Sequence, residues 1–439
     1  MLSTFVASHN VIISAGLLLL AYIFIATEKI PKMTIALIGA ALTIVLGLVS
    51  QTKTVNDVIN PHYFINFVDF NVIFLLVSMM IIVSITTRSG VFNWIANELL
   101  KFTKGHPIKV LCALGLFTAV TSAFLDNVTT VILIMPITFV IAKKLDIDPI
   151  PFLLTEIFTS NIGGTATLIG DPPNIIIGSA GGLSFVDFIK ELTPVVVVIL
   201  LIVVALLAFI FRKKLHATEE KMKEVASIDN SHTITNKNLM LRSTIVLGLV
   251  ILGFMLHDII HIETCVVAML GAAFLMIFEK PEDILKNVEW NTIFFFIGLF
   301  IIIGGLEASG GIRLMAEWII KVTQGSQAAT SMIILWASGV ISGIIDNIPY
   351  TATMAPMLVE IQKTMGSQYT YPLWWALSLG ACLGGNMTII GAAANVIVSE
   401  NANKEGYPIS FMRFLKYGVA IVSISLLIST AYIYLRFLK

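Results

Sequence analysis

The sequence predicts an all-α polytopic membrane protein made of two inverted-topology repeats of about five spans each, with re-entrant hairpins and broken helices. Three observations support this fold class. Hydrophobic residues make up 57% of the 439 residues and charged residues only 12%, and the mean hydropathy is +0.93. Apolar stretches of the length that a bilayer core requires, about 20 residues, recur along the chain. A series of motifs also occurs twice, with an offset of about 220 residues.

The individual spans follow from the apolar stretches. Eight stretches have the length of a membrane span: 11–27, 33–50, 71–88, 186–211, 241–256, 264–279, 291–308 and 415–435. Two further regions, 107–182 and 327–400, have shorter apolar runs that Gly, Pro, Asn and Asp interrupt. Such polar breaks are tolerated at membrane depth only where protein or water covers them. We therefore expect these two regions to form re-entrant hairpins and broken helices inside a bundle.

The internal repeat places these elements in order. VDFNVIFLL from Val68 matches VEWNTIFFF from Val288, and Asp126-Asn127 matches Asp346-Asn347, both at an offset of 220. The offset becomes 221 where GGTATLIGDPPN, from Gly163, matches GGNMTIIGAAAN. Each half then holds three spans, a short amphipathic helix (91–103; 311–323), a hairpin, a broken helix and a last span. The hairpin makes no net crossing, so each half crosses five times and the second half is inverted.

The chain therefore divides into a first transmembrane repeat at 1–212, a polar cytoplasmic linker at 213–240, and a second, inverted repeat at 241–439. With the N-terminus outside, 20 of the 27 Lys and Arg residues fall in cytoplasmic segments, as the positive-inside rule requires. We expect an integral protein of a bacterial or archaeal inner membrane.

Composition also excludes several classes of function. The 27 basic and 27 acidic residues cancel, so the chain offers no basic stripe for nucleic acid. The three cysteines have no spacing that suggests a metal or redox pair. Neither HExxH nor GxSxG is present. We predict that the protein is not an enzyme and has no metal site and no cofactor.

A few acidic residues lie inside the predicted membrane core, where a charge costs about 2.5–3.5 kcal/mol on insertion scales. Asp126 and Asp346 lie at equivalent hairpin tips, Asp171 lies at the first helix break, and Glu156 lies in the helix before it. We expect no lysine or arginine within the two broken regions to neutralise these acids. They must then be protonated, hydrogen-bonded to amides at helix ends, or balanced by a bound cation. Asp126, Asp346 and Glu156 are the candidates for proton coupling.

Short polar side chains and glycines surround these acids, and together they form the predicted binding site for solute or coupling ion. Carbonyls, amides and hydroxyls at helix breaks coordinate cations and polar solutes in transporters. The candidates are Asp126, Asn127, Thr129, Thr130, Gly163, Gly164, Thr165, Thr167, Asp171, Asn174, Asp346, Asn347, Thr351, Asn386, Thr388 and Asn395. The alternative for the tips is that Asp and Asn only cap the broken helices. For Glu156 the alternative is a neutral packing residue.

The motifs SAFLDNVTTVILIMPITF and SNIGGTATLIGDPPNIIIGSA resemble the ion transporter superfamily, in the branch of the arsenite efflux permeases and the P protein, with NhaD-type sodium/proton antiporters nearby. The Ser-Asn-Thr signatures of the dicarboxylate branch are absent at both tips, which disfavours di- and tricarboxylate substrates. The resemblance implies that the hairpin tips and broken-helix loops bind substrate and a coupling ion, H⁺ or Na⁺. It also implies a homodimer, and an ATPase subunit is a further partner to test.

The sequence thus predicts a secondary active transporter. Our hypothesis is proton-coupled export of arsenite or antimonite by alternating access. A sodium/proton antiporter, a transporter of another small anion and an ion channel are the competing functions.

Overall fold

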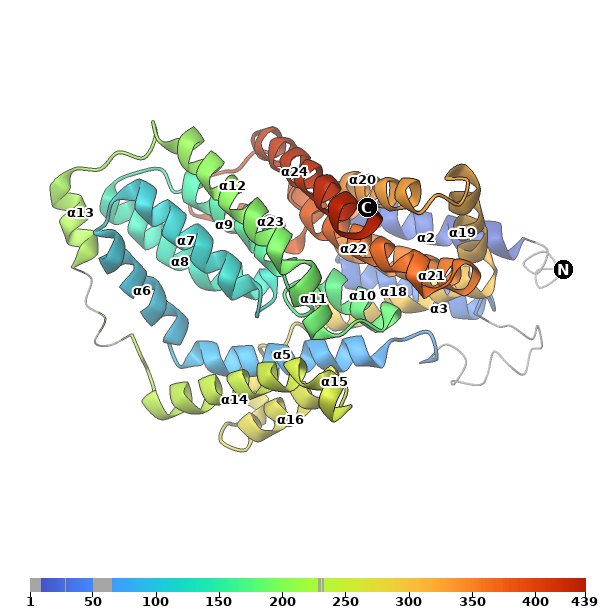
Figure 1. Cartoon of the computed structure of the whole chain (residues 1–439). Coiled ribbons are helices and arrows are strands. Elements are labelled where there is room, and N and C mark those ends of the chain that lie inside the picture. The colour runs from blue at the N-terminus through green and yellow to red at the C-terminus, as the bar shows by residue number, and fades with distance from the viewer. Residues whose placement is uncertain (1–8, 28, 50–64, 228–229, 231–232) are drawn as a thin grey trace.

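The computed structural model describes residues 9–27, 29–49, 65–227, 230 and 233–439, and every regular element in these ranges is helical (Figure 1). Eight of the described helices are long and apolar enough to cross a membrane. The first half consists of α2 (Asn10–Thr27), α3 (Lys32–Val45), α5 (Phe70–Arg88), α6 (Val91–Thr103), α7 (Pro107–Ser122), α8 (Asn127–Leu145), α9 (Ile150–Gly164), α10 (Pro172–Gly181), α11 (Phe185–Glu191) and α12 (Thr193–Phe211).

The second half repeats this order after the short helix α13 (Glu219–Ala226). It consists of α14 (Lys237–Met255), α15 (His257–Ile260), α16 (Thr264–Met276), α17 (Pro281–Leu285), α18 (Trp290–Ala308), α19 (Gly311–Val322), α20 (Gln327–Ile345), α21 (Asn347–Met365), α22 (Ser367–Gly384), η1 (Ile389–Gly391), α23 (Ala393–Lys404), α24 (Phe411–Ile433) and η2 (Tyr434–Leu438). The hairpins are α7–α8 and α20–α21, and the broken helices are α9–α10 and α22–α23.

The repeat extends to the residues that begin and end the helices. Gly90 and Gly310, which are repeat-related, precede the amphipathic helices α6 and α19 with φ values of 82° and 84°. Glycine reaches this left-handed region without steric cost, so the chain can turn sharply there. Pro172 begins α10 in the first turn, where its missing N–H leaves no bond unmade.

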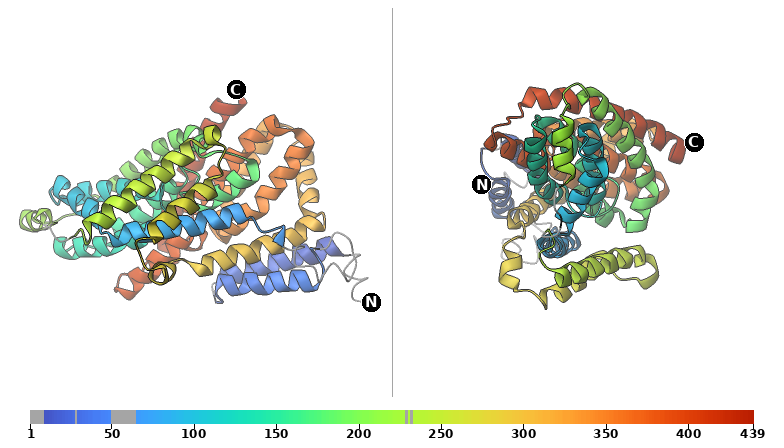
Figure 2. Two further views of the ribbon diagram at one scale, coloured as in Figure 1. Left: turned by 90° about the horizontal axis from the view of Figure 1, so that it is seen from below. Right: turned by 90° about the vertical axis from the view of Figure 1, so that its left-hand side faces the viewer.

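Contacts between helices show how the two halves interlock. Helix α3 packs against α18 of the other half, and α16, the counterpart of α3, packs against α5, the counterpart of α18. In the same way α10 packs against α21, and α23 packs against α8. Each broken helix therefore lies against the hairpin of the opposite half. Two further views show this interleaving: the blue helices α2 and α3 lie beside α18 of the second half, and the yellow helices α14 and α16 lie against α5 of the first half (Figure 2).

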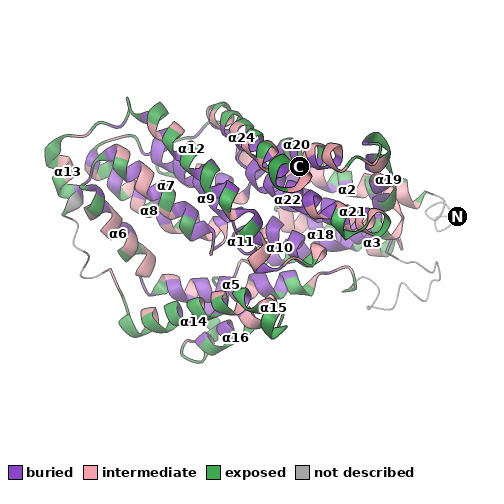
Figure 3. Ribbon diagram, viewed as in Figure 1, coloured by how far each residue is buried: buried purple, intermediate pink, exposed green. Residues whose placement is uncertain are grey.

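The predicted fold class is confirmed. The amphipathic helices, hairpins and broken helices all occur in the predicted order. The stretch 186–211 differs, because it divides into α11 and α12 at Leu192, where Pro194 starts a new helix. The outer helices have exposed faces (Figure 3). Apolar side chains such as Leu19, Ile38 and Leu270 are exposed there, which is what lipid contact requires. The predicted boundaries of the linker, between the first repeat at residue 212 and the second repeat after residue 240, stay a prediction.

Candidate functional site

The tip of the first hairpin is closed by its own side chains. Asp126 caps α8, and its carboxylate accepts hydrogen bonds from the Thr129 backbone N–H at 2.8 Å and the Thr129 hydroxyl at 2.5 Å. Asp126 and Thr129 therefore face each other at the helix end and are partly exposed. Their arrangement is that of a helix cap, as in the capping alternative.

The tip of the second hairpin is held differently. The Asp346 carboxylate accepts a hydrogen bond from the Ile348 backbone N–H at 3.1 Å, and it forms an ion pair with Lys32 at 2.5 Å. This ion pair was not among the expected ways of balancing the core acids, because its cation is a lysine outside the two broken regions. Lys32 is far away in sequence, in the first turn of α3, and only packing between the halves brings it here. Asp346 also has a φ of 115°, a strained value that costs about 1–3 kcal/mol for a residue with a side chain.

Two asparagines hold the two helix breaks in shape. The Asn174 amide donates to the Thr165 carbonyl at 3.2 Å and the Thr167 carbonyl at 2.8 Å. Its counterpart Asn395 donates to the Gly385 carbonyl at 2.8 Å and the Thr388 carbonyl at 2.9 Å. Each loop therefore satisfies its free carbonyls from the helix that follows it, as a break inside a membrane must.

In each loop, one threonine ties the loop to the neighbouring hairpin tip. The Thr167 hydroxyl donates to the Ala123 carbonyl, and the Thr388 hydroxyl donates to the Gly343 carbonyl at 2.6 Å. Ala123 and Gly343 are repeat-related, so both tips are fastened to their broken helices in the same way. Each hairpin and its broken helix thus form one hydrogen-bonded unit.

Asn161 joins the two units at the centre of the protein. Its amide donates to Asn386 Oδ1 at 2.8 Å and to Asn395 Oδ1 at 2.9 Å, and its Oδ1 lies 3.1 Å from the Asn127 amide. In the opposite direction, the Asn347 amide donates to both oxygens of Asp171 at 3.3 Å and 3.2 Å. All six residues are almost fully buried. We call this set, together with Asn174, the central polar cluster.

Close backbone packing surrounds this cluster. A Cβ on Gly163 would lie 2.1 Å from the Ala119 carbonyl oxygen, and one on Gly164 would lie 2.3 Å from Asn127 Oδ1. Glycine is required at both positions because no side chain fits. The Thr165 hydroxyl donates a hydrogen bond to the Asn161 carbonyl, one turn back in the helix, at 2.8 Å.

Several buried polar atoms of the hairpins and broken helices have no hydrogen-bond partner among the described residues. They include the hydroxyls of Thr130, Ser160 and Thr351 and one oxygen of Glu156. The other Glu156 oxygen accepts a hydrogen bond from the Thr138 hydroxyl of the first hairpin. Unpaired buried polar groups are costly, so these atoms are candidates to contact a solute or proton.

Sequence reasoning missed Lys32, Ser378 and Cys382. The Ser378 hydroxyl and the Cys382 thiol both approach Asn174 Oδ1, at 2.6 Å and 3.4 Å. Cys382 stands where the repeat puts Asn161, and each donates to the asparagine of the opposite break. Alignment of the repeats could have found this role for Cys382. No sequence signal points to Lys32.

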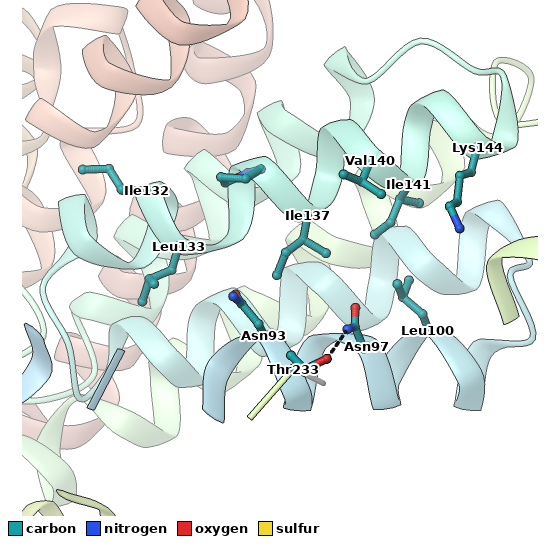
Figure 4. Close-up of a pocket in the computed structure, with 11 residues that line it drawn as sticks. Asn93, Asn97, Leu100, Ile132, Leu133, Ile137, Val140, Ile141, Lys144 and Thr233 are labelled. Atoms are coloured by element: carbon teal, nitrogen blue, oxygen red, sulfur yellow. Dashed lines mark hydrogen bonds between the residues drawn. The ribbon is translucent and has the colours of Figure 1, made fainter. Parts of the chain in front are cut away.

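A separate groove of about 470 Å³ lies between α6 and α8 (Figure 4). Its walls are mostly apolar, as Leu133, Ile137 and Val140 illustrate, with Asn97 and Lys144 among the polar lining residues. None of the predicted site residues lines it. The groove is therefore distinct from the central polar cluster.

Comparisons with known proteins agree with this architecture. A family model described as a citrate transporter (CitMHS) matches residues 22–380. The 46 kDa membrane protein of Mycobacterium leprae is 41% identical over 97% of this chain and 99% of its own length. An uncharacterized transporter of Mycobacterium tuberculosis is also 41% identical, over 97% of this chain and 98% of its own length.

More distant likenesses extend the comparison. The pig P protein is 31% identical over 97% of this chain, which spans 59% of that protein. The YdaH transporter of Alcanivorax borkumensis, whose crystal structure has an unusual topology, shares 13% identity and a TM-score of 0.58, covering 97% of this chain and 98% of that one. This last likeness concerns the fold alone. With its paired hairpins and broken helices, the chain is a membrane transporter and belongs to the citrate transporter (CitMHS) family of the ion transporter superfamily.

Proposed function

We propose that this protein is a secondary active transporter that exports arsenite or antimonite in exchange for protons by alternating access. The observation that carries the proposal is the central polar cluster, where amides from both halves meet across the two helix breaks. Such a cluster sits where an inverted-repeat transporter binds its substrate.

The chemistry of the cluster suits an uncharged, hydroxyl-rich solute. Asparagine side chains supply both donors and acceptors, and threonine and serine hydroxyls supply either. Arsenite at neutral pH is mainly a neutral trihydroxide, which offers the same groups in return. The buried hydroxyls of Thr130, Ser160 and Thr351 have no partner among the described residues, and we propose that they contact the solute.

The family description names citrate, and a tricarboxylate is the main rival on that ground. A triply charged anion needs cationic partners when it is desolvated. The central polar cluster contains one carboxylate, Asp171, and amides. Lys32 lies at the edge, against Asp346. This charge pattern supports a neutral solute or a cation over citrate.

Three carboxylates are the candidates for proton exchange. Glu156 is fully buried, with one oxygen unpaired among the described residues. Asp126 and Asp346 lie at the two hairpin tips. In the proposed mechanism each hairpin moves together with its broken helix, and the tip carboxylate moves with them. A sodium/proton antiporter would use the same acids, and this alternative keeps the tips as sodium sites.

The decisive experiment is flux into proteoliposomes of purified protein. Arsenite, antimonite, sodium, lithium and citrate are compared under an imposed pH gradient, with Glu156→Gln and Asp126→Asn as variants and Asp148→Asn, at an exposed loop position, as the matched control. The proposal expects saturable arsenite flux that the pH gradient drives and that either core variant reduces. Sodium flux without arsenite flux would establish the antiporter, citrate flux would establish the substrate for which the family is named, and non-saturating flux would indicate a channel.

Assembly and orientation belong to the same proposal. We expect a homodimer in an inner membrane with the N-terminus outside. Cross-linking in membranes tests the dimer, labelling of a cysteine placed near the N-terminus tests the orientation, and co-purification tests an ATPase partner.

A further inference from the structure

The two hairpin tips are repeat-related, yet they differ in charge. Asp126 and Asp346 occupy the same repeat position, and each caps the second arm of its hairpin. The Asp346 carboxylate is 2% exposed and lies 2.5 Å from the Lys32 ammonium. For Asp126, no lysine or arginine lies within ion-pair distance in the described part of the chain, and its carboxylate accepts hydrogen bonds from Thr129. Among the described residues, one tip therefore has its own cation and the other has none.

Lys32 belongs to a helix of the first half, which places it at this tip. It begins α3, which packs along α18, and so does not belong to the hairpin that carries Asp346. The neighbouring helix α2 supports the same place, because the Tyr22 hydroxyl donates to the Pro349 carbonyl at 2.6 Å. The ion pair therefore joins a scaffold helix to the tip of the hairpin.

A lysine ammonium and a bound monovalent cation carry the same charge and seek the same carboxylate oxygens. Two cations cannot share one buried carboxylate without strong repulsion in a medium of low dielectric constant. The ammonium of Lys32 therefore blocks any sodium ion from the oxygen that it contacts. A buried carboxylate without a counter-charge would, by contrast, attract one.

We propose that Lys32 is the built-in counter-cation of the second hairpin tip, so that this tip binds no external sodium ion and Lys32 determines which cations the transporter uses. The inference rests on the proposed role of the tips as coupling-ion sites. It predicts that removing the ammonium turns the second tip into a sodium site.

The test measures thermal unfolding of the purified protein in NaCl against choline chloride at constant ionic strength. Lys32→Gln is compared with the wild type and with Lys29→Gln, a matched control at an exposed lysine three residues away. A ligand that binds only the folded state raises the unfolding midpoint as its concentration rises. We expect Lys32→Gln to gain a sodium-dependent rise of roughly 2 °C or more relative to the wild type. Lys29→Gln should respond as the wild type does.

Two further variants separate the site from its fold. The double variant Lys32→Gln/Asp346→Asn removes both charges, and it should lose the added sodium response. Asp346→Asn alone should leave the wild-type sodium response unchanged, because the second tip binds no sodium to begin with. Loss of the wild-type response in Asp346→Asn would overturn the inference even if Lys32→Gln does not fold. So would a folded Lys32→Gln protein with the wild-type sodium response. These readouts need no arsenite, so failure of arsenite flux would refute the proposed function alone.

Discussion

Replacing Asn161 with alanine is the most direct test of the central polar cluster. The substitution removes the amide that donates to Asn386 and Asn395 and the oxygen that lies against Asn127. Hydrogen bonds between membrane helices contribute about 0.6 kcal/mol each on average. Three lost contacts thus cost roughly 2 kcal/mol, or about a 30-fold change in the folded-to-unfolded ratio.

The assay is the thermal unfolding midpoint in detergent, together with solute flux in proteoliposomes. We expect the midpoint of Asn161→Ala to fall by roughly 4 °C and flux to fall further, because we propose that the same amides bind the solute. Asn401→Ala is the matched control, since among the described residues the Asn401 amide donates only to the Ile397 carbonyl of its own helix, at 2.9 Å. Asn161→Cys should be intermediate, because the cysteine at the repeat position, Cys382, still donates to an asparagine.

Equal midpoints for Asn161→Ala and Asn401→Ala would refute the reasoning. They would show that the amides joining the two halves add nothing to stability. A normal midpoint with lost flux would instead confine Asn161 to solute binding.

Three other changes test separate parts of the structure. Thr388→Val removes the hydroxyl that donates to a hairpin tip at 2.6 Å, so flux should fall at least threefold, whereas Thr388→Ser should retain it. Gly163→Ala puts a Cβ 2.1 Å from a backbone oxygen and should abolish monodisperse protein in size-exclusion chromatography, whereas Gly248→Ala, with nothing within 4 Å, should not. The Asn230 amide of the linker donates a hydrogen bond to the Glu98 carboxylate. This bond and, to a lesser extent, Lys101 lower the pKa of Glu98 below its usual value. The hydrogen bond is therefore fully formed above pH 4.5 and weakens as the pH falls through the lowered pKa. Limited proteolysis of the linker should therefore increase below pH 4.5, and Asn230→Ala should show the same cleavage already at pH 7.

Much of the fold could be predicted because bilayer chemistry constrains local sequence strongly. A span needs about 20 apolar residues, so the ends of α2, α5, α14 and α18 fall within a few residues of the predicted stretches. The repeat then placed the hairpins and the breaks without any knowledge of packing. Where Pro194 divided an apolar run into α11 and α12, the length of the run concealed the division.

The candidate site could be predicted only in part. The repeat marked Asn127, Asn174 and Asn395 as residues at hairpin tips and helix breaks, and the structure brings them into one connected region. It did not separate residues that cap a helix, such as Asp126, from those that face the centre. That distinction depends on side-chain direction, which a motif does not contain.

By itself, the sequence determined that this chain is a membrane protein of two repeats. The bilayer imposes the hydropathy of each span, and the repeat is visible as matching motifs along the chain. Only the tertiary structure decided which charges meet. Lys32 and Asp346 lie 314 residues apart, and they pair because the first half supplies a scaffold helix to the hairpin of the second. The amide of Asn161 reaches the opposite break for the same reason. Contacts between interlocked halves arise from packing across the pseudo-two-fold arrangement, and no local pattern encodes them.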